Sequence, residues 1–200
     1  MPSISRQLPG NYALDIKGVS YGLRAVAYPD DLALLHSWMH RPHVVPQWQL
    51  DVPVAKLAAH FEVMLADDHQ RLYLVMLDER PVGYVEIYEG YRDRLARYYQ
   101  ADINDLGWHL LIGEEDIVGH GHLKPIVVML STFIFGHSPA TRIVGEPDVR
   151  VKAYSVTAEA LSYVPQRELP MPEKTAMLYY CVKETFLKSR YYLEHIAETA

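Results

Sequence analysis

Apolar residues form short runs, or alternate with polar residues, in six stretches of the chain, and these patterns predict β-strands. The segment 78–81, Asp-Glu-Arg-Pro, separates the second stretch from the third and predicts a tight turn between antiparallel strands. The six predicted strands are Val19–Ala27, Arg71–Leu77, Val82–Tyr88, Gly107–Ile112, Thr141–Glu146 and Thr175–Phe186.

Four other stretches carry apolar residues every three or four positions, the spacing that covers one face of a helix. The first predicted helix follows an Asp-Asp pair at positions 30 and 31, and the second begins at Pro53; both residue types favour helix starts. The third spans His122–Phe135 and the fourth spans Val149–Tyr163, with Pro165 beyond its end. The apolar faces of the first two helices are Leu32, Leu35, Trp38 and Met39, then Val54, Leu57, Phe61 and Met64.

Three further segments have no clear period. Prolines interrupt Arg41–Trp48, which predicts an irregular loop, and the charged, tyrosine-rich Tyr91–Ile103 predicts a loop with a short helix. The end of the chain predicts a short helical tail. The order β-α-α-β-β-β-α-β-α-β predicts one mixed α/β domain over residues 1–200, built on a single continuous sheet.

Composition narrows the class of protein. A chain of 200 residues, 50% of them hydrophobic, suits one globular domain with a full core. A net charge of −6 without a basic run argues against nucleic-acid binding, and no apolar stretch reaches the roughly 20 residues of a membrane span. The single cysteine, Cys181, is interpreted as a buried core thiol in a reducing compartment, so we expect a cytoplasmic protein.

The segment Asp105–Gly121 carries the clearest functional signal. An apolar strand ends in a turn that contains Gly119 and Gly121, and an unbroken apolar helix follows. Bare backbone N–H groups at a helix N-terminus form a site for phosphate or pyrophosphate. The alternative is a simple connecting turn.

Two residues near predicted strands are candidates for catalysis. His109 can accept a proton near neutral pH, although a lone strand histidine often only hydrogen-bonds a neighbour. Asp148 precedes a predicted helix, where it is either an N-cap or a ligand-binding residue at a strand end. His36 and His40 have helical ligand spacing but no evident third ligand, so we predict no metal site.

An acidic and aromatic cluster lies between positions 84 and 99. Tyr84, Glu86 and Tyr88 alternate onto one face of their predicted strand, and Glu89 and Asp93 follow. This face would hold an amine or ammonium group by charge and cation–π contact, or it is simply solvated. Similarly, Trp48 either lines a pocket entrance or fixes its loop to the core.

Taken together, these motifs resemble the GNAT acyl-CoA transferases, and within them the branch that acylates hydroxylamines for hydroxamate siderophores of the aerobactin and alcaligin type. The lysine acyltransferase of mycobactin assembly is a related member. The resemblance spans about Leu23 to Phe186. It is carried by Arg-Pro-His-Val-Val-Pro-Gln-Trp at 41–48, Gly-Tyr-Val-Glu-Ile-Tyr at 83–88, Asp-Leu-Gly-Trp-His-Leu-Leu-Ile-Gly at 105–113, the glycine turn, and Glu-Pro-Asp-Val-Arg at 146–150.

The resemblance implies the GNAT fold, in which helices flank a mixed, mostly antiparallel sheet and two central strands splay apart around the pantetheine of acyl-CoA. It implies that His109 is the general base and that Asp148 positions the substrate or the histidine. Backbone N–H groups just beyond His109 would polarise the thioester carbonyl. The residues that it assigns to the cofactor are Leu110, Leu111, Ile112, Gly119, His120, Gly121 and Lys124.

One position departs from the family pattern. The family has Gln or Arg three residues before the first glycine of the turn, where this chain has Asp116. A carboxylate repels pyrophosphate, so we expect Asp116 to point away. Anion binding would then fall to the backbone of Gly119–Gly121 and to Lys124.

The implied activity is transfer of an acyl group from acetyl-CoA or succinyl-CoA to an N-hydroxylated amine, which gives a hydroxamate. The acceptor would be hydroxylysine, hydroxyputrescine or hydroxycadaverine, and a succinyl carboxylate would need Arg142 or Arg150. We expect a monomer or weak homodimer. The predicted acceptor-binding residues are Trp48, Glu86, Tyr88, Glu89 and Asp93.

Two alternatives stay open. One is an aminoglycoside-type amine N-acetyltransferase, which would share the scaffold and an acidic, aromatic pocket. The other is a non-catalytic acyl-CoA-binding domain.

Overall fold

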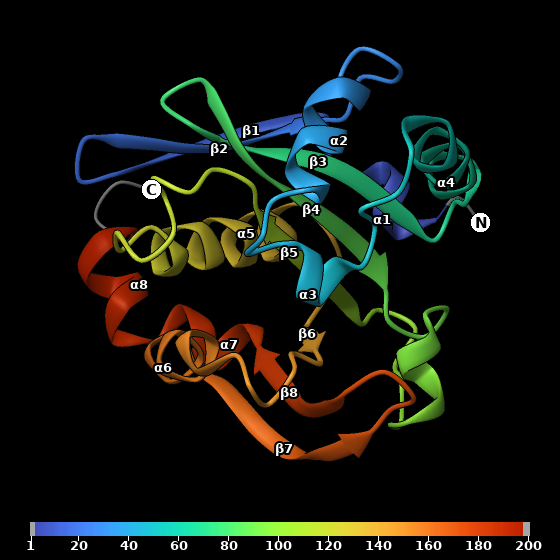
Figure 1. Ribbon diagram of the computed structural model, residues 1–200. Coiled ribbons are helices and arrows are strands. Elements are labelled where there is room, and N and C mark those ends of the chain that lie inside the picture. Colours follow the sequence, from blue (N-terminus) through green and yellow to red (C-terminus); the bar gives the residue numbers. More distant parts are fainter. Residues whose placement is uncertain (1–2, 198–200) are drawn as a thin grey trace.

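The computed structural model describes residues 3–197, in which eight strands form one continuous sheet with helices on both faces (Figure 1). The strand order is β1-β2-β3-β4-β5-β6-β8-β7, and every neighbouring pair is antiparallel except β5 and β6. The predicted mixed, mostly antiparallel sheet is therefore confirmed. The strands are β1 (Asn11–Ile16), β2 (Val19–Ala25), β3 (Gln70–Leu77), β4 (Arg80–Glu89), β5 (Leu106–Ile112), β6 (Arg142–Gly145), β7 (Tyr163–Pro170) and β8 (Thr175–Val182).

Short helices connect the strands, and two longer helices build the core. Residues 32–39 and 54–66 are helical, as the apolar spacing predicts, and the helix predicted from position 122 forms over 123–137. The helices are α1 (Ile4–Gln7), α2 (Leu32–Met39), α3 (Val45–Trp48), α4 (Val54–Ala66), η1 (Arg94–Arg97), α5 (Leu123–His137), α6 (Lys152–Ala160), α7 (Lys183–Leu187) and α8 (Arg190–His195).

The alternation of side chains along β3 assigns the two faces of the sheet. Tyr73 and Val75 pack on one face in the cluster that contains most of α5, while Leu72 and Leu74 pack on the other face against α2 and α4. Figure 1 shows α5 on the opposite side of β1–β4 from α2 and α4. The helices thus bury the apolar residues of both faces, the main stabilising term in such a fold.

The predicted hairpin at residues 71–88 is confirmed as β3 and β4. Asp78 and Glu79 form its two-residue turn, and both have positive φ angles, of 46° and 67°. Two positive φ angles match the twist of the flanking strands, as in a type I′ turn.

Some boundary predictions are wrong. The segment 41–48 is not wholly irregular, because 45–48 forms one helical turn, α3. The helix predicted over 149–163 ends at Ala160, and the strand predicted to reach position 186 ends at Val182, where α7 begins. Strands β1 and β7 and helix α1 were not predicted. Pro165 and Pro170 argued against a strand at the position of β7. Because β7 is an edge strand, however, its prolines cost no ladder hydrogen bond.

The central strands β5 and β6 diverge after a short contact. In the described part of the chain they pair only at Leu106 with Ile143 and at Gly107 with Val144. Beyond these pairs the sheet opens into a V. This gap is the splay that the family resemblance implies.

Two sequence interpretations concern burial and membranes. Cys181 is fully buried, and burial raises the pKa of its thiol, so it is a core residue. Within residues 3–197, none of the helices combines the length and the apolar character that a membrane span requires.

Candidate active site

The parallel register of β5 and β6 places two chemical groups opposite each other where the strands separate. Gly107 and Val144 form the last backbone pair. His109 lies two residues after Gly107, and Glu146 lies two residues after Val144. Their side chains bridge the gap, with His109 Nε2 2.9 Å from Glu146 Oε1.

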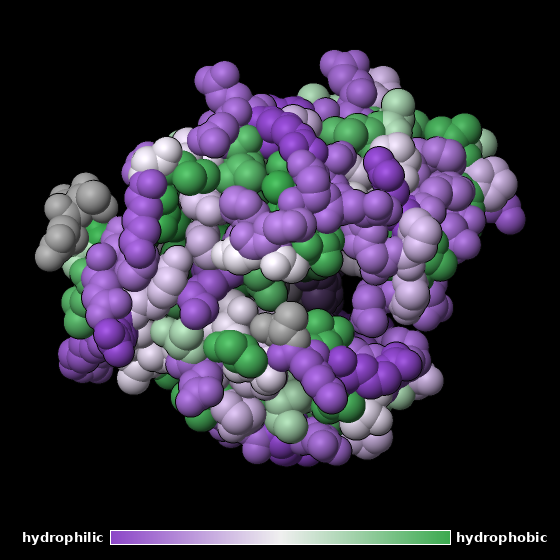
Figure 2. Space-filling view, turned by 60° about the vertical axis from the view of Figure 1, so that its left-hand side comes forward, coloured by the Kyte–Doolittle hydropathy of each residue, from purple (hydrophilic) through white to green (hydrophobic). Residues whose placement is uncertain are grey.

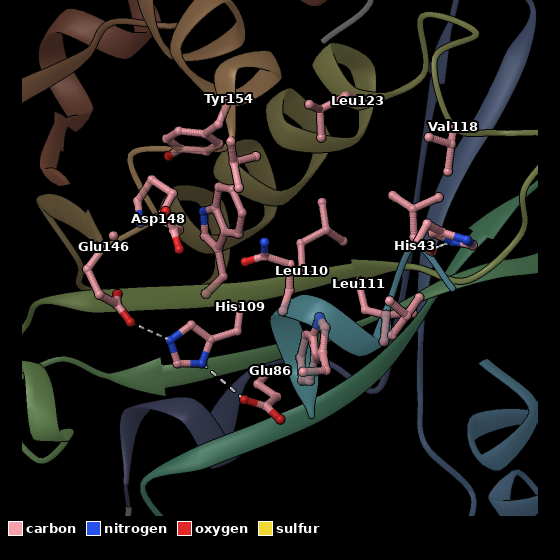
Figure 3. A pocket seen from close by; sticks show the side chains of 18 of the residues that line it. His43, Glu86, His109, Leu110, Leu111, Val118, Leu123, Glu146, Asp148 and Tyr154 are labelled. Atoms are coloured by element: carbon pink, nitrogen blue, oxygen red, sulfur yellow. Dashed lines mark hydrogen bonds and ion pairs between the residues drawn. The ribbon is translucent and has the colours of Figure 1, made fainter. Parts of the chain in front are cut away.

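A second carboxylate lies on the other side of His109. Glu86 is its direct partner in the antiparallel β4–β5 ladder, and His109 Nδ1 is 3.0 Å from Glu86 Oε2. Each carboxylate also accepts a hydrogen bond from a tyrosine of β4: Tyr84 donates to Glu86 at 3.1 Å and Tyr88 donates to Glu146 at 3.0 Å. Figure 3 shows the imidazole between the two carboxylates.

These contacts determine the charge of the site. Burial alone would lower the pKa of His109, but Glu146 and Glu86 outweigh this effect and raise the pKa to about 10. Burial likewise raises the pKa of Glu146, whereas His109, Lys174 and Tyr88 more than reverse this and lower it to about 2. At neutral pH His109 of the free site is therefore an imidazolium in contact with the Glu146 carboxylate. We call Glu86, His109 and Glu146 the triad.

The triad faces a cavity of about 760 Å³. This volume lies in the range of small-molecule sites. Figure 2 shows one face of the molecule hollowed by a dark opening that both hydrophobic and hydrophilic residues surround. The lining comes mainly from β4, β5, α3, α4, the glycine turn and the residues that follow β6, with single residues from η1, α5, α6 and the turn before β8.

One side of the cavity is the exposed edge of β5. Leu110, Leu111 and Ile112 all line the cavity, and the described residues place no strand beside this edge. His43 fixes the end of the edge through a 2.9 Å contact between its Nε2 and the carbonyl oxygen of Ile112. The remaining backbone groups fit the extended amide chain of a pantetheine and the carbonyl of a thioester.

The glycine turn closes this side of the cavity. Gly119 and Gly121 line it with φ angles of 79° and 86°, a conformation that L side chains rarely adopt. The turn leads into α5, whose first N–H groups lack helical partners and favour an anion. His120 is exposed on the turn, and Lys124 lies with its ammonium 5.5 Å from the centre of the Tyr191 ring.

Asp116 points away from the turn, as expected. Its carboxylate binds the Arg80 guanidinium through contacts of 2.8 Å and 2.9 Å. This ion pair lowers the pKa of Asp116. The negative charge of Asp116 therefore has its partner outside the glycine turn.

The resemblance implies that Asp148 positions either the substrate or His109. Asp148 lines the cavity, but its carboxylate is engaged by the backbone N–H and guanidinium of Arg150. Arg150 lowers the pKa of Asp148 to about 2. Glu146, two residues earlier, is the residue that binds His109. Sequence reasoning missed this role, although Glu146 lies in the same Gly-Glu-Pro-Asp segment.

The predicted acceptor-binding residues divide into two groups. Glu86 and Trp48 line the cavity, and Tyr88 holds Glu146 with its ring centre 4.5 Å from that of His109. Glu89 and Asp93 have other partners. Glu89 binds Ser5 and Arg92, and Asp93 caps η1 through the N–H of Leu95.

Two cations of the cavity were not found from the sequence. Arg94 and Lys174 both line it, whereas Arg142 binds Asp105 elsewhere. Arg94 pairs with Glu173, and Lys174 contacts Glu146. Only the register of distant segments brings these cations to the cavity, and no local motif marks them.

The comparisons with known proteins agree with this geometry. The family described as "Acetyltransferase (GNAT) domain" matches residues 27–171. The chain therefore belongs to the GNAT acetyltransferase family, and it is an acyltransferase that uses acyl-CoA. This family membership sets aside a non-catalytic binding domain.

Two named proteins are similar to this chain in sequence. The chain is 50% identical to "N-hydroxyputrescine acetyltransferase" of Acinetobacter baumannii, over 93% of this chain and 89% of that protein. It is 31% identical to "Lysine N-acyltransferase MbtK" of Mycobacterium tuberculosis, over 65% of this chain and 62% of that protein.

Solved structures share the fold. An uncharacterized protein from Bacillus halodurans has a TM-score of 0.87 and 31% identity, covering 92% of this chain and 95% of that one. The aminoglycoside acetyltransferase AAC(6')-Ib in complex with coenzyme A has a TM-score of 0.75 at 22% identity, covering 84% of this chain and 98% of that one. The second likeness concerns the fold alone.

Proposed function

We propose that this enzyme transfers the acetyl group of acetyl-CoA to the hydroxylamine nitrogen of an N-hydroxylated diamine such as N-hydroxyputrescine. The product is a hydroxamate, a bidentate iron ligand used in siderophores. The observation that carries the proposal is the 50% identity, over 93% of this chain, to a protein named for that reaction. The charge and position of the triad support it.

The triad suits a nucleophile that arrives uncharged. A hydroxylamine nitrogen is less basic than an alkylamine nitrogen, so at neutral pH it presents a free electron pair. It does not need a strong base to remove a proton before it attacks. The enzyme needs a group that takes up a proton as the new bond forms.

The triad as a whole can take up that proton. With His109 protonated, its formal charge is −1, because two carboxylates flank one imidazolium. We therefore propose that His109 acts together with Glu86 and Glu146, and not as an isolated neutral base. Both of its ring nitrogens are already engaged.

The acetyl transfer then proceeds in two bond-making and bond-breaking steps. The nitrogen electron pair attacks the thioester carbonyl and forms the N–C bond, and collapse of the tetrahedral intermediate breaks the C–S bond. The nitrogen loses its proton to a carboxylate of the triad, and the leaving thiolate recovers one proton from the triad. Backbone N–H groups among Leu110, Leu111 and Ile112 stabilise the developing oxyanion.

We assign the distal ammonium of the diamine to the acidic part of the cavity. Glu86 and Asp148 line it, and the aromatic ring of Trp48 adds an apolar wall. Glu89 and Asp93 are less suited to this role because they hold α1 and η1 in place. A charge-assisted contact of this kind contributes about 1–3 kcal/mol.

We propose acetyl-CoA as the donor in preference to succinyl-CoA. A succinyl carboxylate would need a free cation near the acyl group. Of the described residues, Arg94 and Lys174 are the lysine and arginine side chains that line the cavity, and each already has an acidic partner. Acetyl-CoA needs no such partner.

Two further expectations accompany this function. Acyl-CoA is made inside cells, so we place the reaction in the cytoplasm. We expect the enzyme to work as a monomer or weak homodimer.

A thiol-release assay tests the proposal. Acetyl-CoA and succinyl-CoA are each offered with N-hydroxyputrescine, N-hydroxycadaverine, N6-hydroxylysine and their non-hydroxylated parents. We expect turnover with acetyl-CoA and the hydroxylated diamines. Equal turnover of the non-hydroxylated parents, or turnover of an aminoglycoside such as kanamycin added as a further acceptor, would contradict the proposal and place the enzyme among the amine acetyltransferases.

A further inference from the structure

Lys174 makes two contacts with the triad residue Glu146. It lies in the turn between β7 and β8, just before Thr175. Its Nζ donates to the backbone carbonyl of Glu146 at 2.6 Å and lies 3.6 Å from the carboxylate oxygen Oε1. That oxygen is also the one that contacts His109. Lys174 therefore holds both the backbone and the side chain of Glu146.

The neighbourhood keeps Lys174 in this place. The carbonyl of Lys174 accepts the N–H of Met171 at 2.9 Å, which closes the turn. The preceding residue, Glu173, pairs with Arg94 of η1 at 2.5 Å. The Lys174 side chain is 18% exposed and the Glu146 side chain is 1% exposed, so water screens their contact weakly.

We propose that Lys174 is a positioning residue of this acyltransferase: it holds the Glu146 carboxylate against His109, and its charge sets the pH range in which the triad exchanges protons. This inference rests on the proposed role of the triad. Lys174 has no place in the predicted chemistry, and the reaction above gives it no direct step.

The sign of its effect follows from charge. The ammonium of Lys174 disfavours an extra proton on either Glu146 or His109. Removing it makes protonation of both groups easier, so their titrations move to higher pH. The other titratable or charged groups around this pair are Tyr88, Asp148, Tyr154, Arg94, Glu173 and, through His109, Glu86. All of them stay in the variants below, so the difference isolates Lys174.

The first arm of the test is independent of any substrate. NMR of the histidine rings follows His109 from pH 7 to about pH 12 in the wild type, Lys174→Met and Lys174→Arg, with His109→Gln identifying its signals. We expect Lys174→Met to raise the titration midpoint by about 0.5–1 unit. The neutral fraction of His109 at pH 10 then falls about two- to fivefold. Lys174→Arg restores the wild-type behaviour because it keeps the charge.

The second arm measures the pH profile of kcat/KM with acetyl-CoA and N-hydroxyputrescine. We expect both limbs of the profile to move to higher pH in Lys174→Met and to return in Lys174→Arg. Lys56→Met is the matched control, since it removes the same charge from an exposed position of α4. It should leave both the profile and the His109 titration unchanged.

Two results would overturn the proposal. One is an unchanged His109 titration in Lys174→Met, because even with lower activity Lys174 would then only support the turn. The other is an equal titration shift in Lys56→Met, which would reflect net charge alone. Failure of the wild type to acetylate hydroxylamines would reject the proposed function, yet the NMR arm would still decide the role of Lys174.

Discussion

Glu146 contacts His109 across the open end of the V between β5 and β6, with 2.9 Å between Oε1 and Nε2. The contact exists because the parallel register continues past the last backbone pair, while the strands themselves separate. The divergence of β5 and β6 and the contact between His109 and Glu146 thus have one structural cause.

The first prediction concerns His109 itself. His109→Gln removes the proton-exchanging ring, and we expect kcat to fall by about 10²–10⁴-fold. Acetyl-CoA binding should change little, because the β5 edge and the glycine turn remain. Steady-state kinetics and calorimetric titration with acetyl-CoA measure the two quantities. His40→Gln, at an exposed position, serves as the control, and wild-type kcat in His109→Gln would contradict the prediction.

The second prediction separates Glu146 from Asp148. Glu146→Gln removes a charge that contacts His109, so it should lower kcat by at least about tenfold. Asp148 binds Arg150 and lines the cavity, so Asp148→Asn should mainly raise the KM of the diamine. Kinetics with acceptor varied at saturating acetyl-CoA distinguish these effects. A larger loss of kcat in Asp148→Asn than in Glu146→Gln would reverse the assignment.

The third prediction concerns stability and pH. The folded-state pKa of His109, about 10, lies above the ordinary value of 6.5. The folded protein then binds a proton that the unfolded chain releases, so the stabilisation is complete below pH 6.5 and is lost as the pH rises through 10. Between pH 7 and pH 9.5 we expect the wild type to lose on the order of 2–3 kcal/mol more than His109→Gln.

Urea unfolding of both proteins at the two pH values measures this difference. Other groups that titrate in this range are common to both proteins and cancel. Equal losses in the two proteins would mean that His109 is not an imidazolium in the folded enzyme.

The fourth prediction concerns the space that Gly107 leaves for Tyr88. A Cβ at Gly107 would collide with the Tyr88 ring, which lies tilted beside the His109 ring and donates to Glu146. Gly107→Ala should therefore destabilise the protein by about 1–3 kcal/mol and reduce kcat. Thermal unfolding and kinetics test both effects.

Gly136→Ala is the matched control for that substitution. Gly136 lies in α5, and an added Cβ there meets nothing within 4 Å. Alanine in a helix interior should stabilise the protein by about 0.5–1 kcal/mol and leave activity unchanged. Similar effects of the two substitutions would show that the Tyr88 ring adapts to the added methyl group.

Local patterns predicted the elements whose signals lie within one stretch of sequence. The turn at Asp78 and Glu79 and the apolar face of α5 are examples. Strand β7 was not predicted, because prolines usually interrupt strands. The sheet tolerates the prolines of β7 only because β7 is an edge strand. Sequence reasoning also extended the final strand to Phe186, although α7 begins at Lys183 and opens with the polar residues Lys183, Glu184 and Thr185.

The sequence predicted part of the site, namely the residues that local patterns mark. His109 and Glu86 were both found, but their contact depends on the β4–β5 register. Glu146 and Lys174 were missed as site residues because their positions depend on pairings between distant strands. Composition and spacing do not encode such pairings locally. Asp148 was named as a candidate because its position before a helix can be read from the local sequence.

The most direct test of the central claim is detection of the hydroxamate product. Wild-type enzyme and His109→Gln are each incubated with acetyl-CoA and an equimolar mixture of N-hydroxyputrescine and putrescine. Mass spectrometry and the absorbance of the ferric complex then identify the product. We predict N-acetylated hydroxyputrescine from the wild type and a large loss with His109→Gln. Acetylputrescine as the main product, or undiminished hydroxamate from His109→Gln, would contradict the account.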